Sequence, residues 1–382
     1  MDRIFTACHG TQLLVIQHLR RHLLLPPGRD FLVWHPQENS PFIDDFMQRV
    51  ISTAEFADVL DMRDFQSLRP RTAGPVAWSL ESVRRLRRDA TVLRIWLAKN
   101  GITESEAELW ADDPIHLNVS FLRGLLRKSR QIKIPHSFNH DDVNSVDWKR
   151  STERQWRDTP WAKRFLFLPW QRWASGVDLR MERICYQRGY TFDLPSCWAA
   201  DSIDVSPAVS IDAFDATYQT LPASTRAEVE ANLAPILTAP RPLVLLLLFG
   251  LHGRDEEKFG PIYQRSLRRI FVDRASELRN CSLAVKVHPG SYGDEEQKFF
   301  DWLRDNVPAR ILPITHALNL EFLLPQLRPD YVLAGLCGAL PIVRRLGVAR
   351  PVALSEMINL YSDAHPAERE SIDAFLTGIE IW

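Results

Sequence analysis

The chain has 382 residues, a length that favours two domains of ordinary size. Its 45% of hydrophobic and 25% of charged residues are typical of a soluble globular protein, and the formal net charge of -1 excludes an overall attraction to nucleic acid. The cysteines are odd in number and show no C-x-x-C spacing, so we expect neither a disulfide framework nor a zinc site.

The N-terminal residues do not follow the pattern of a secretory signal, because charged side chains interrupt the apolar run after Gln12. The longest apolar run, Pro242 to Leu251, is too short to span a bilayer. We therefore expect a cytoplasmic protein, either soluble or peripheral at the inner face of the cytoplasmic membrane.

The beginning of the chain alternates between expected strands and helices. Residues 4–8 predict a strand, His9-Gly10-Thr11 a turn, Gln12 to Leu25 a helix and 31–35 the next strand. This order is typical of a doubly wound α/β domain. Further helices are expected at 41–52 and 79–88, and a strand followed by a helix at 91–100.

Two adjacent acidic residues, Asp112 and Asp113, follow an expected strand that ends at Trp110. A helical pattern at 115–128 and a short strand at 131–135 come after them. The carboxyl ends of parallel strands are favoured positions for catalytic groups. The acidic pair is therefore a candidate for the catalytic site.

The composition changes from Asp141 onward, where tryptophans and arginines become frequent as far as Trp173. One interpretation is a basic and aromatic surface for a membrane face or a polysaccharide. The other is a helical subdomain whose tryptophans form its core and whose arginines extend to solvent. We treat 141–200 as an insertion in a first domain that covers 1–240.

A second α/β unit is expected at 241–355, beginning with the uninterrupted apolar run Leu243 to Phe249. Strands and helices alternate from there, which predicts a second parallel sheet. A helical tail, 356–382, is expected to pack back on the first domain. The fold class is therefore α/β, with two Rossmann-like, doubly wound domains facing a central cleft.

Four loops that follow strands of the second unit offer groups for a nucleotide. Gly250 allows a base to approach the backbone, and Lys286 and His288 can contact a phosphate. Glu321 can accept hydrogen bonds from ribose hydroxyls. The segment Gly335 to Gly338 precedes a helix, whose N-terminus favours a phosphate. Together, in this order, these groups predict a nucleotide site.

Several of these residues stand in motifs of a known family. Lys286-Val-His-Pro289, Glu321 and Cys337-Gly338-Ala-Leu340 occur in order, and Asp112-Asp113-Pro114 precedes them. With the opening His9-Gly10-Thr11-Gln12, this arrangement resembles bacterial GT-B sialyltransferases and polysialyltransferases, which use CMP-activated nonulosonic acids. The resemblance covers both domains, best from Leu243 to Gly347.

The resemblance implies a role for each matching residue of the second domain. His288 assists the departing CMP phosphate, and Glu321 holds the ribose. Lys286 supports the His288 loop electrostatically, and Pro289 belongs to the same donor-binding motif. Cys337 and Gly338 stand where the family has paired serines that contact the phosphate. The implied reaction is an inverting transfer that needs no metal and no other cofactor.

In the first domain the resemblance makes Asp113 the general base and Asp112 its neighbour, where Pro114 replaces a family glycine. His9, Gln12, His116 and His136 are candidates for the acceptor side. The expected partners are a CMP-sugar and an oligosaccharide or glycolipid of the bacterial surface, such as capsule or lipopolysaccharide. Peripheral membrane contact through the Trp/Arg-rich segment is also expected.

Two alternatives stay open at this point. One is a GT-B glycosyltransferase with a different nucleotide-sugar donor. The other is a non-catalytic carbohydrate-binding subunit of a polysaccharide assembly complex.

Overall fold

The structure is a computed structural model of the whole chain. The residues that it describes are 1–8, 10–35, 48, 51, 56–62, 75–111, 117–135, 173, 175–177, 188–191, 203–205, 210–248, 265, 267–286, 294–314, 319–335, 337, 339–355, 358–359, 373 and 376–382. Contacts divide the chain into two compact units, and the second begins its main segment at Val209.

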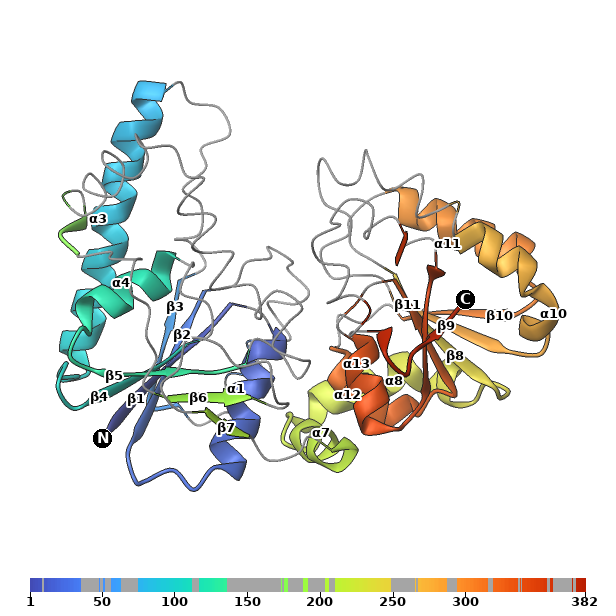
Figure 1. Cartoon of the computed structure of the whole chain (residues 1–382), viewed down its shortest axis with the longest axis horizontal. Helices are drawn as coiled ribbons and strands as arrows, with labels where there is room; N and C mark the ends of the chain where they lie inside the picture. The colour runs from blue at the N-terminus through green and yellow to red at the C-terminus, as the bar shows by residue number, and fades with distance from the viewer. Residues whose placement is uncertain are drawn as a thin grey trace. The chain divides into compact units, whose positions relative to one another are not determined.

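The first unit contains a parallel sheet with the strand order β3-β2-β1-β4-β5-β6-β7 (Figure 1). The strands are β1 Asp2–Ala7, β2 Arg29–Trp34, β3 Asp58–Asp61, β4 Ala107–Ala111, β5 Arg130–Lys133, β6 Arg188–Thr191 and β7 Ile203–Val205. The accompanying helices are α1 Gly10–His22, α3 Pro75–Lys99 and α4 Leu117–Leu125. The short strand β3 is one that the sequence patterns did not predict.

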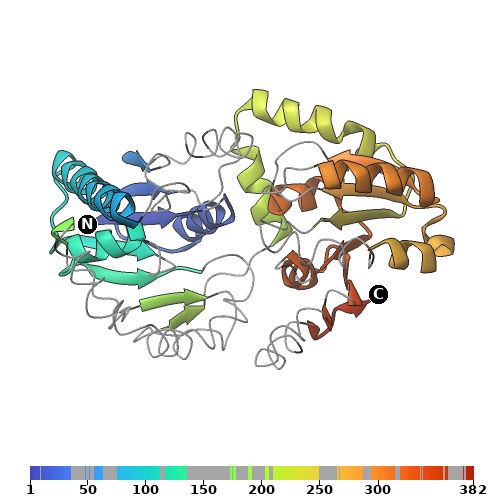
Figure 2. The same cartoon turned by 90° about the horizontal axis from the view of Figure 1, so that it is seen from above.

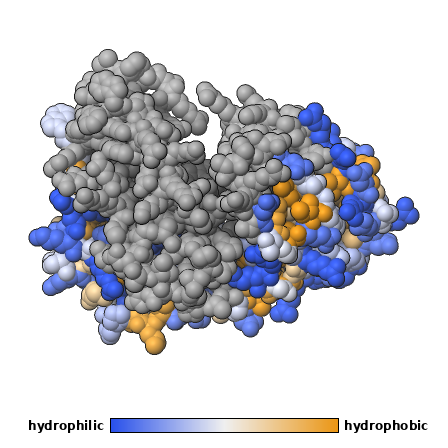
Figure 3. Space-filling view, viewed as in Figure 1, coloured by the Kyte–Doolittle hydropathy of each residue, from blue (hydrophilic) through white to orange (hydrophobic). Residues whose placement is uncertain are grey.

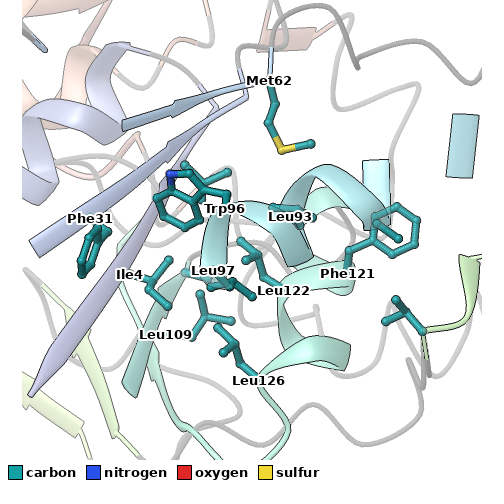
Figure 4. Packing of buried hydrophobic residues seen from close by; sticks show 14 of the residues in the cluster. Ile4, Phe31, Met62, Leu93, Trp96, Leu97, Leu109, Phe121, Leu122 and Leu126 are labelled. Carbon is teal, nitrogen blue, oxygen red and sulfur yellow. The ribbon is translucent and has the colours of Figure 1, made fainter. Parts of the chain in front are cut away.

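One face of this sheet packs against α3 and α4 (Figure 4). Ile4 and Phe31 point from the sheet toward Leu93 and Leu97 of α3, and all four are buried. The ring of Phe31 meets Trp96 edge to face at 5.8 Å. Full burial of an aliphatic side chain contributes about 1.5–3 kcal/mol, so this layer holds the helices on the sheet.

Helix α3 corrects a prediction, because the strand expected within 91–100 is part of a continuous helix. The β-branched pair Thr91-Val92 favours a strand locally. Leu86, Ala90, Leu93 and Leu97, however, are buried at the spacing of one helical face. Packing of this apolar face on the sheet therefore outweighs the local preference for a strand, and the segment is helical.

Asp89 lies on α3 with 1% of its surface exposed, and Arg88 Nε donates to it at 3.3 Å. Burial raises the pKa of this carboxyl to about 6, although Arg88 opposes the shift. Because the folded state holds the proton more tightly, stability falls as pH rises from about 4 to about 6 and is then constant. We expect Asp89→Asn to remove this pH dependence and to stabilise the protein at neutral pH by about 3 kcal/mol. Urea unfolding across this pH range measures both effects, and an unchanged pH profile in the variant would contradict the assignment.

The second unit contains a parallel sheet with the order β10-β9-β8-β11-β12-β13. Its strands are β8 Leu243–Leu247, β9 Ser282–Lys286, β10 Arg310–Ile314, β11 Tyr331–Ala334, β12 Arg350–Ala353 and β13 Glu380–Ile381. Its helices are α7 Ile211–Gln219, α8 Ala223–Leu237, α10 Ala275–Leu278, α11 Asp294–Asn306, α12 Leu320–Leu327 and α13 Ala339–Leu346. The predicted fold class, α/β with two Rossmann-like doubly wound units, is confirmed.

Helices α7 and α8 belong to this second unit, whereas the sequence placed the domain boundary at 240 (Figure 2). Tyr218 of α7 packs near Phe322 of α12, with 6.1 Å between ring centroids. Gln326 Nε2 donates to Asp215 Oδ1 at 3.0 Å. Burial raises the pKa of the Tyr218 hydroxyl to about 12. These contacts join residues more than 100 positions apart, which is why local composition did not reveal them.

The end of the chain also differs from its prediction, because β13 adds a strand to the second sheet at the edge of β12. Ser355 N–H donates to the Trp382 carbonyl at 2.7 Å, and Trp382 N–H donates to the Ala353 carbonyl at 2.9 Å. Backbone pairing of this kind has almost no sequence signal in a strand of two residues. The described end of the tail is therefore fixed to the second unit.

Among the described residues, no helix combines the length and hydropathy that crossing a bilayer requires. On the face shown in Figure 3, the described surface consists mainly of hydrophilic residues with small groups of apolar ones.

Candidate functional site

The strand order of the second unit creates a switch point between β8 and β11. From β8 the chain adds β9 and β10 on one side, and then continues with β11 to β13 on the other. Connections leave the two sides in opposite directions, which opens the carboxyl edge of the sheet to ligands. Leu247 of β8 pairs in register with both Lys286 of β9 and Ala334 of β11. These three neighbouring strands therefore end at the same height of the sheet.

Lys286 is the last residue of β9 and is only 8% exposed. The preceding Leu-Ala-Val run is fully buried in the sheet, and Leu248 N–H donates to the Lys286 carbonyl at 2.9 Å. A buried ammonium is costly unless a charged or polar group compensates it. The strand therefore holds a cation at the carboxyl edge of the sheet.

Glu321 lies in the first turn of α12 and is 4% exposed. The N–H groups of Phe322 and Leu323 donate to the Asn319 carbonyl and begin the helix. A carboxylate is favoured in a first turn because the helix N-terminus carries partial positive charge. The apolar residues that follow it, Phe322 to Leu324, are buried and anchor this end of the helix.

Cys337 begins the turn that leads from β11 into α13, and its carbonyl accepts a bond from Leu340 N–H at 3.0 Å. The pKa of its thiol is raised, chiefly by burial and then by the Glu321 carboxylate. A hydrogen bond from Ala339 N–H and the Lys286 ammonium act in the opposite direction. The sulfur thus accepts the N–H of the first residue of α13.

Lys286 and Glu321 thus both lie within electrostatic range of the Cys337 thiol. The three residues come from the end of β9, the start of α12 and the turn before α13. A cation and a helix N-terminus favour an anion, and a carboxylate accepts hydrogen bonds from hydroxyl groups. The cluster therefore suits a ligand that carries both a phosphate and sugar hydroxyls.

The reactivity of the Cys337 thiol gives a direct test of this proximity. Because its pKa is raised, we expect slower alkylation by iodoacetamide in the folded than in the denatured chain. Removing the Glu321 charge with Glu321→Gln should speed the reaction, whereas Lys286→Met should slow it. Mass spectrometry of the Cys337 peptide measures both rates. Equal effects of the two variants would show that their charges do not act on this thiol.

A clasp between β8 and the end of α12 helps to position Glu321. Arg241 donates to the carbonyls of Leu327 and Arg328 at 2.9 and 2.6 Å. Asp330 Oδ2 accepts bonds from Leu243 N–H at 2.7 Å and from Arg241 at 3.2 Å. These positioning residues were missed in the sequence because they lie 86 to 89 positions apart.

In the first unit, the structure describes Gln12 among the predicted acceptor-side residues. Its side-chain oxygen accepts a bond from Cys8 N–H at 2.7 Å, and the residue is 2% exposed. Gln12 therefore braces the loop after β1 rather than presenting that oxygen to a ligand. This loop lies at the switch point between β1 and β4.

The other predicted site residues lie outside the described residues, and their roles stay predictions. They are His9, Asp112, Asp113, His116, His136, Gly250, His288, Pro289 and Gly338. The described part of the chain contains no group of three or more His, Cys, Asp or Glu side chains that could hold a metal ion.

A scan against protein-family models and a search of curated proteins find no match. Among solved structures, the chain is similar to a Methanocaldococcus jannaschii UDP-GlcNAc 2-epimerase in complex with UDP-GlcNAc and UDP. The identity is 12%, the match covers 93% of this chain and 84% of that chain, and the TM-score is 0.49. It is also similar to a Photobacterium sp. JT-ISH-224 2,6-sialyltransferase in complex with CMP and lactose. There the identity is 9%, the match covers 100% of this chain and 78% of that chain, and the TM-score is 0.47. A shared activity does not follow from similarity at this level.

Proposed function

We propose that the protein is a glycosyltransferase of the GT-B type that transfers a nonulosonic acid, of the sialic acid or Kdo kind, from a CMP-sugar to a bacterial surface glycan. The observation that supports this proposal is that Lys286, at the carboxyl edge of the second sheet, and Glu321 both act on the Cys337 thiol. The resemblance to the sialyltransferase family implies that these residues contact the donor. The acceptor would be a growing oligosaccharide or glycolipid.

In this proposal the second unit binds the donor through its nucleotide. Lys286 attracts the phosphate electrostatically, together with the N-terminus of α13. Glu321 accepts hydrogen bonds from the ribose hydroxyls. His288 donates a proton or a hydrogen bond to the phosphate oxygen that leaves the sugar.

Asp113, with Asp112 beside it, removes the proton of the acceptor hydroxyl. That oxygen forms a bond to the anomeric carbon while the bond from this carbon to the phosphate oxygen breaks. A single displacement inverts the anomeric configuration. The departing group carries one phosphate, so Lys286 and His288 can balance its charge without a metal ion.

Cys337 is the main departure from the family pattern within the described site. Its sulfur accepts the Ala339 N–H, where a serine would offer a hydroxyl donor to the phosphate. More of the phosphate binding then depends on Lys286. This difference favours a divergent member of the family with its own sugar or acceptor.

Calorimetry with CMP, CDP and UDP tests the donor. We expect CMP to bind at least about tenfold more tightly than UDP, a difference of about 1.4 kcal/mol. Equal binding or a preference for UDP would refute the CMP donor and favour a different nucleotide sugar. Acceptor-independent hydrolysis of a CMP-sugar separates an enzyme from a non-catalytic carbohydrate-binding subunit, because only an enzyme breaks the bond to the phosphate.

A further inference from the structure

Helix α3 presents a basic face to solvent between Arg84 and Lys99. The face repeats at helical spacing, and its main members are Arg84, Arg87, Arg88, Arg94, Ile95 and Lys99. The acidic residue in this stretch, Asp89, is buried and pairs with Arg88, and Lys99 pairs with Asp58 of β3. Since the whole chain has a net charge of only -1, this local excess of positive charge is a distinct surface feature.

Trp173, which comes from a distant part of the sequence, lies beside this helix face. The Arg87 guanidinium is 5.2 Å from the ring centroid of Trp173. Arg94 donates to the carbonyls of Ser175 and Gly176 at 3.3 and 2.8 Å. Val177 is buried in the core that α3 shares with the sheet, so the segment is fixed to the helix at several points.

Two large apolar side chains are exposed among these arginines. Ile95 is 62% exposed and Trp173 is 66% exposed. Arginines alone could bind any polyanion. Exposed apolar and indole side chains between them bind favourably where an anionic surface covers an apolar interior, because their apolar surface is then removed from water. An anionic lipid bilayer has both properties, whereas a soluble polyanion offers only the charge.

We propose that the exposed face of α3, together with Trp173, binds the anionic phospholipid surface of a membrane. Arg84 and Arg87 contact the headgroups, and Ile95 and Trp173 enter the interface. The proposal goes beyond the transfer reaction and does not depend on it. It also moves the expected membrane contact from the segment 141–200 as a whole to a defined surface built mainly by α3.

Vesicle co-sedimentation of the 382-residue protein tests this surface. The protein should bind vesicles that contain phosphatidylglycerol, bind less at high salt, and not bind vesicles of phosphatidylcholine alone. The double variant Arg84→Gln, Arg87→Gln should bind about 25-fold more weakly, since each arginine near an anionic bilayer contributes about fivefold. Ile95→Ser should weaken binding to vesicles but leave binding to dextran sulfate unchanged.

The matched control is Arg269→Gln, Arg304→Gln, which removes two exposed arginines from the second unit. This control should bind vesicles like the wild type, and the melting temperatures of all variants should agree. Three results would each overturn the proposal: no binding of the wild type to phosphatidylglycerol vesicles, equal losses in the test and control variants, or no effect of Ile95→Ser on vesicle binding. In the last case, tighter binding to dextran sulfate than to vesicles would identify a soluble polyanion as the partner.

Discussion

Replacing Lys286 by methionine is expected to lower kcat/KM for transfer from a CMP-sugar by about 10²- to 10³-fold. Lys286 is 8% exposed at the end of β9, and its ammonium acts on Cys337, which precedes α13. A charge fixed in a poorly hydrated place stabilises the phosphate strongly as negative charge grows on it. Methionine keeps an unbranched side chain that is one atom shorter, but it removes that charge. Steady-state kinetics with a labelled CMP-sugar measures the loss.

Two comparisons determine what the result means. Lys128→Met removes an exposed lysine from the first unit and should leave kcat/KM unchanged. His288→Ala and Asp113→Ala should both abolish transfer if their predicted roles are correct. Retained activity in Lys286→Met, with an unchanged melting temperature, would contradict the role of Lys286. Retained activity in His288→Ala and Asp113→Ala would contradict the catalytic roles while leaving the nucleotide site intact.

Trp110→Ala is expected to destabilise the first unit by about 3–5 kcal/mol. The indole is 1% exposed, stacks on Tyr190 with 5.4 Å between centroids, and lies 5.3 Å from Phe5. Its Nε1 donates to Glu108 Oε2 at 3.0 Å, so the truncation also deprives a buried carboxylate of a donor. Urea unfolding followed by far-UV circular dichroism measures the change.

Trp173→Ala is the matched control, because the same truncation at a side chain that is 66% exposed should cost less than about 1 kcal/mol. The loss of stability in Trp110→Phe should lie between those of Trp110→Ala and Trp173→Ala, since phenylalanine keeps an aromatic ring but loses the bond to Glu108. A cost below about 1 kcal/mol for Trp110→Ala would mean that the aromatic cluster does not support the sheet.

The overall fold could be predicted because most strands carry a strong local signal. The run at Leu243 to Leu247 is apolar and fully buried, as a central parallel strand requires. Where prediction was wrong, distant contacts decided the structure. Thr91 and Val92 favour a strand, but they lie in α3 because Leu93 and Leu97 pack on the sheet. The place of α7 depends on partners in α12 that are distant in sequence.

The candidate site could be predicted in part, and the reason lies in the geometry of parallel sheets. The carboxyl ends of parallel strands lie at one edge of the sheet, so Lys286 at the end of β9 and Cys337 after β11, the two strands that flank β8, could be expected at the same edge. The sequence could not predict the bond between Gln12 and Cys8 or the clasp formed by Arg241 and Asp330, because side-chain hydrogen bonds depend on exact positions in space. The sequence suggested Gln12 as a ligand contact, whereas its oxygen holds the backbone of Cys8.

The clasp between Arg241 and Asp330 also has a consequence for how the protein is made. It joins residues 89 positions apart and fixes the end of the helix that carries Glu321. During synthesis, Arg241 emerges from the ribosome long before Asp330 does. The central strand β8 therefore cannot be fully buried until β11 and α12 have been synthesised. Until then its apolar side chains are exposed and can be bound by chaperones. The first unit, whose sheet lies earlier in the chain, can fold before this closure takes place.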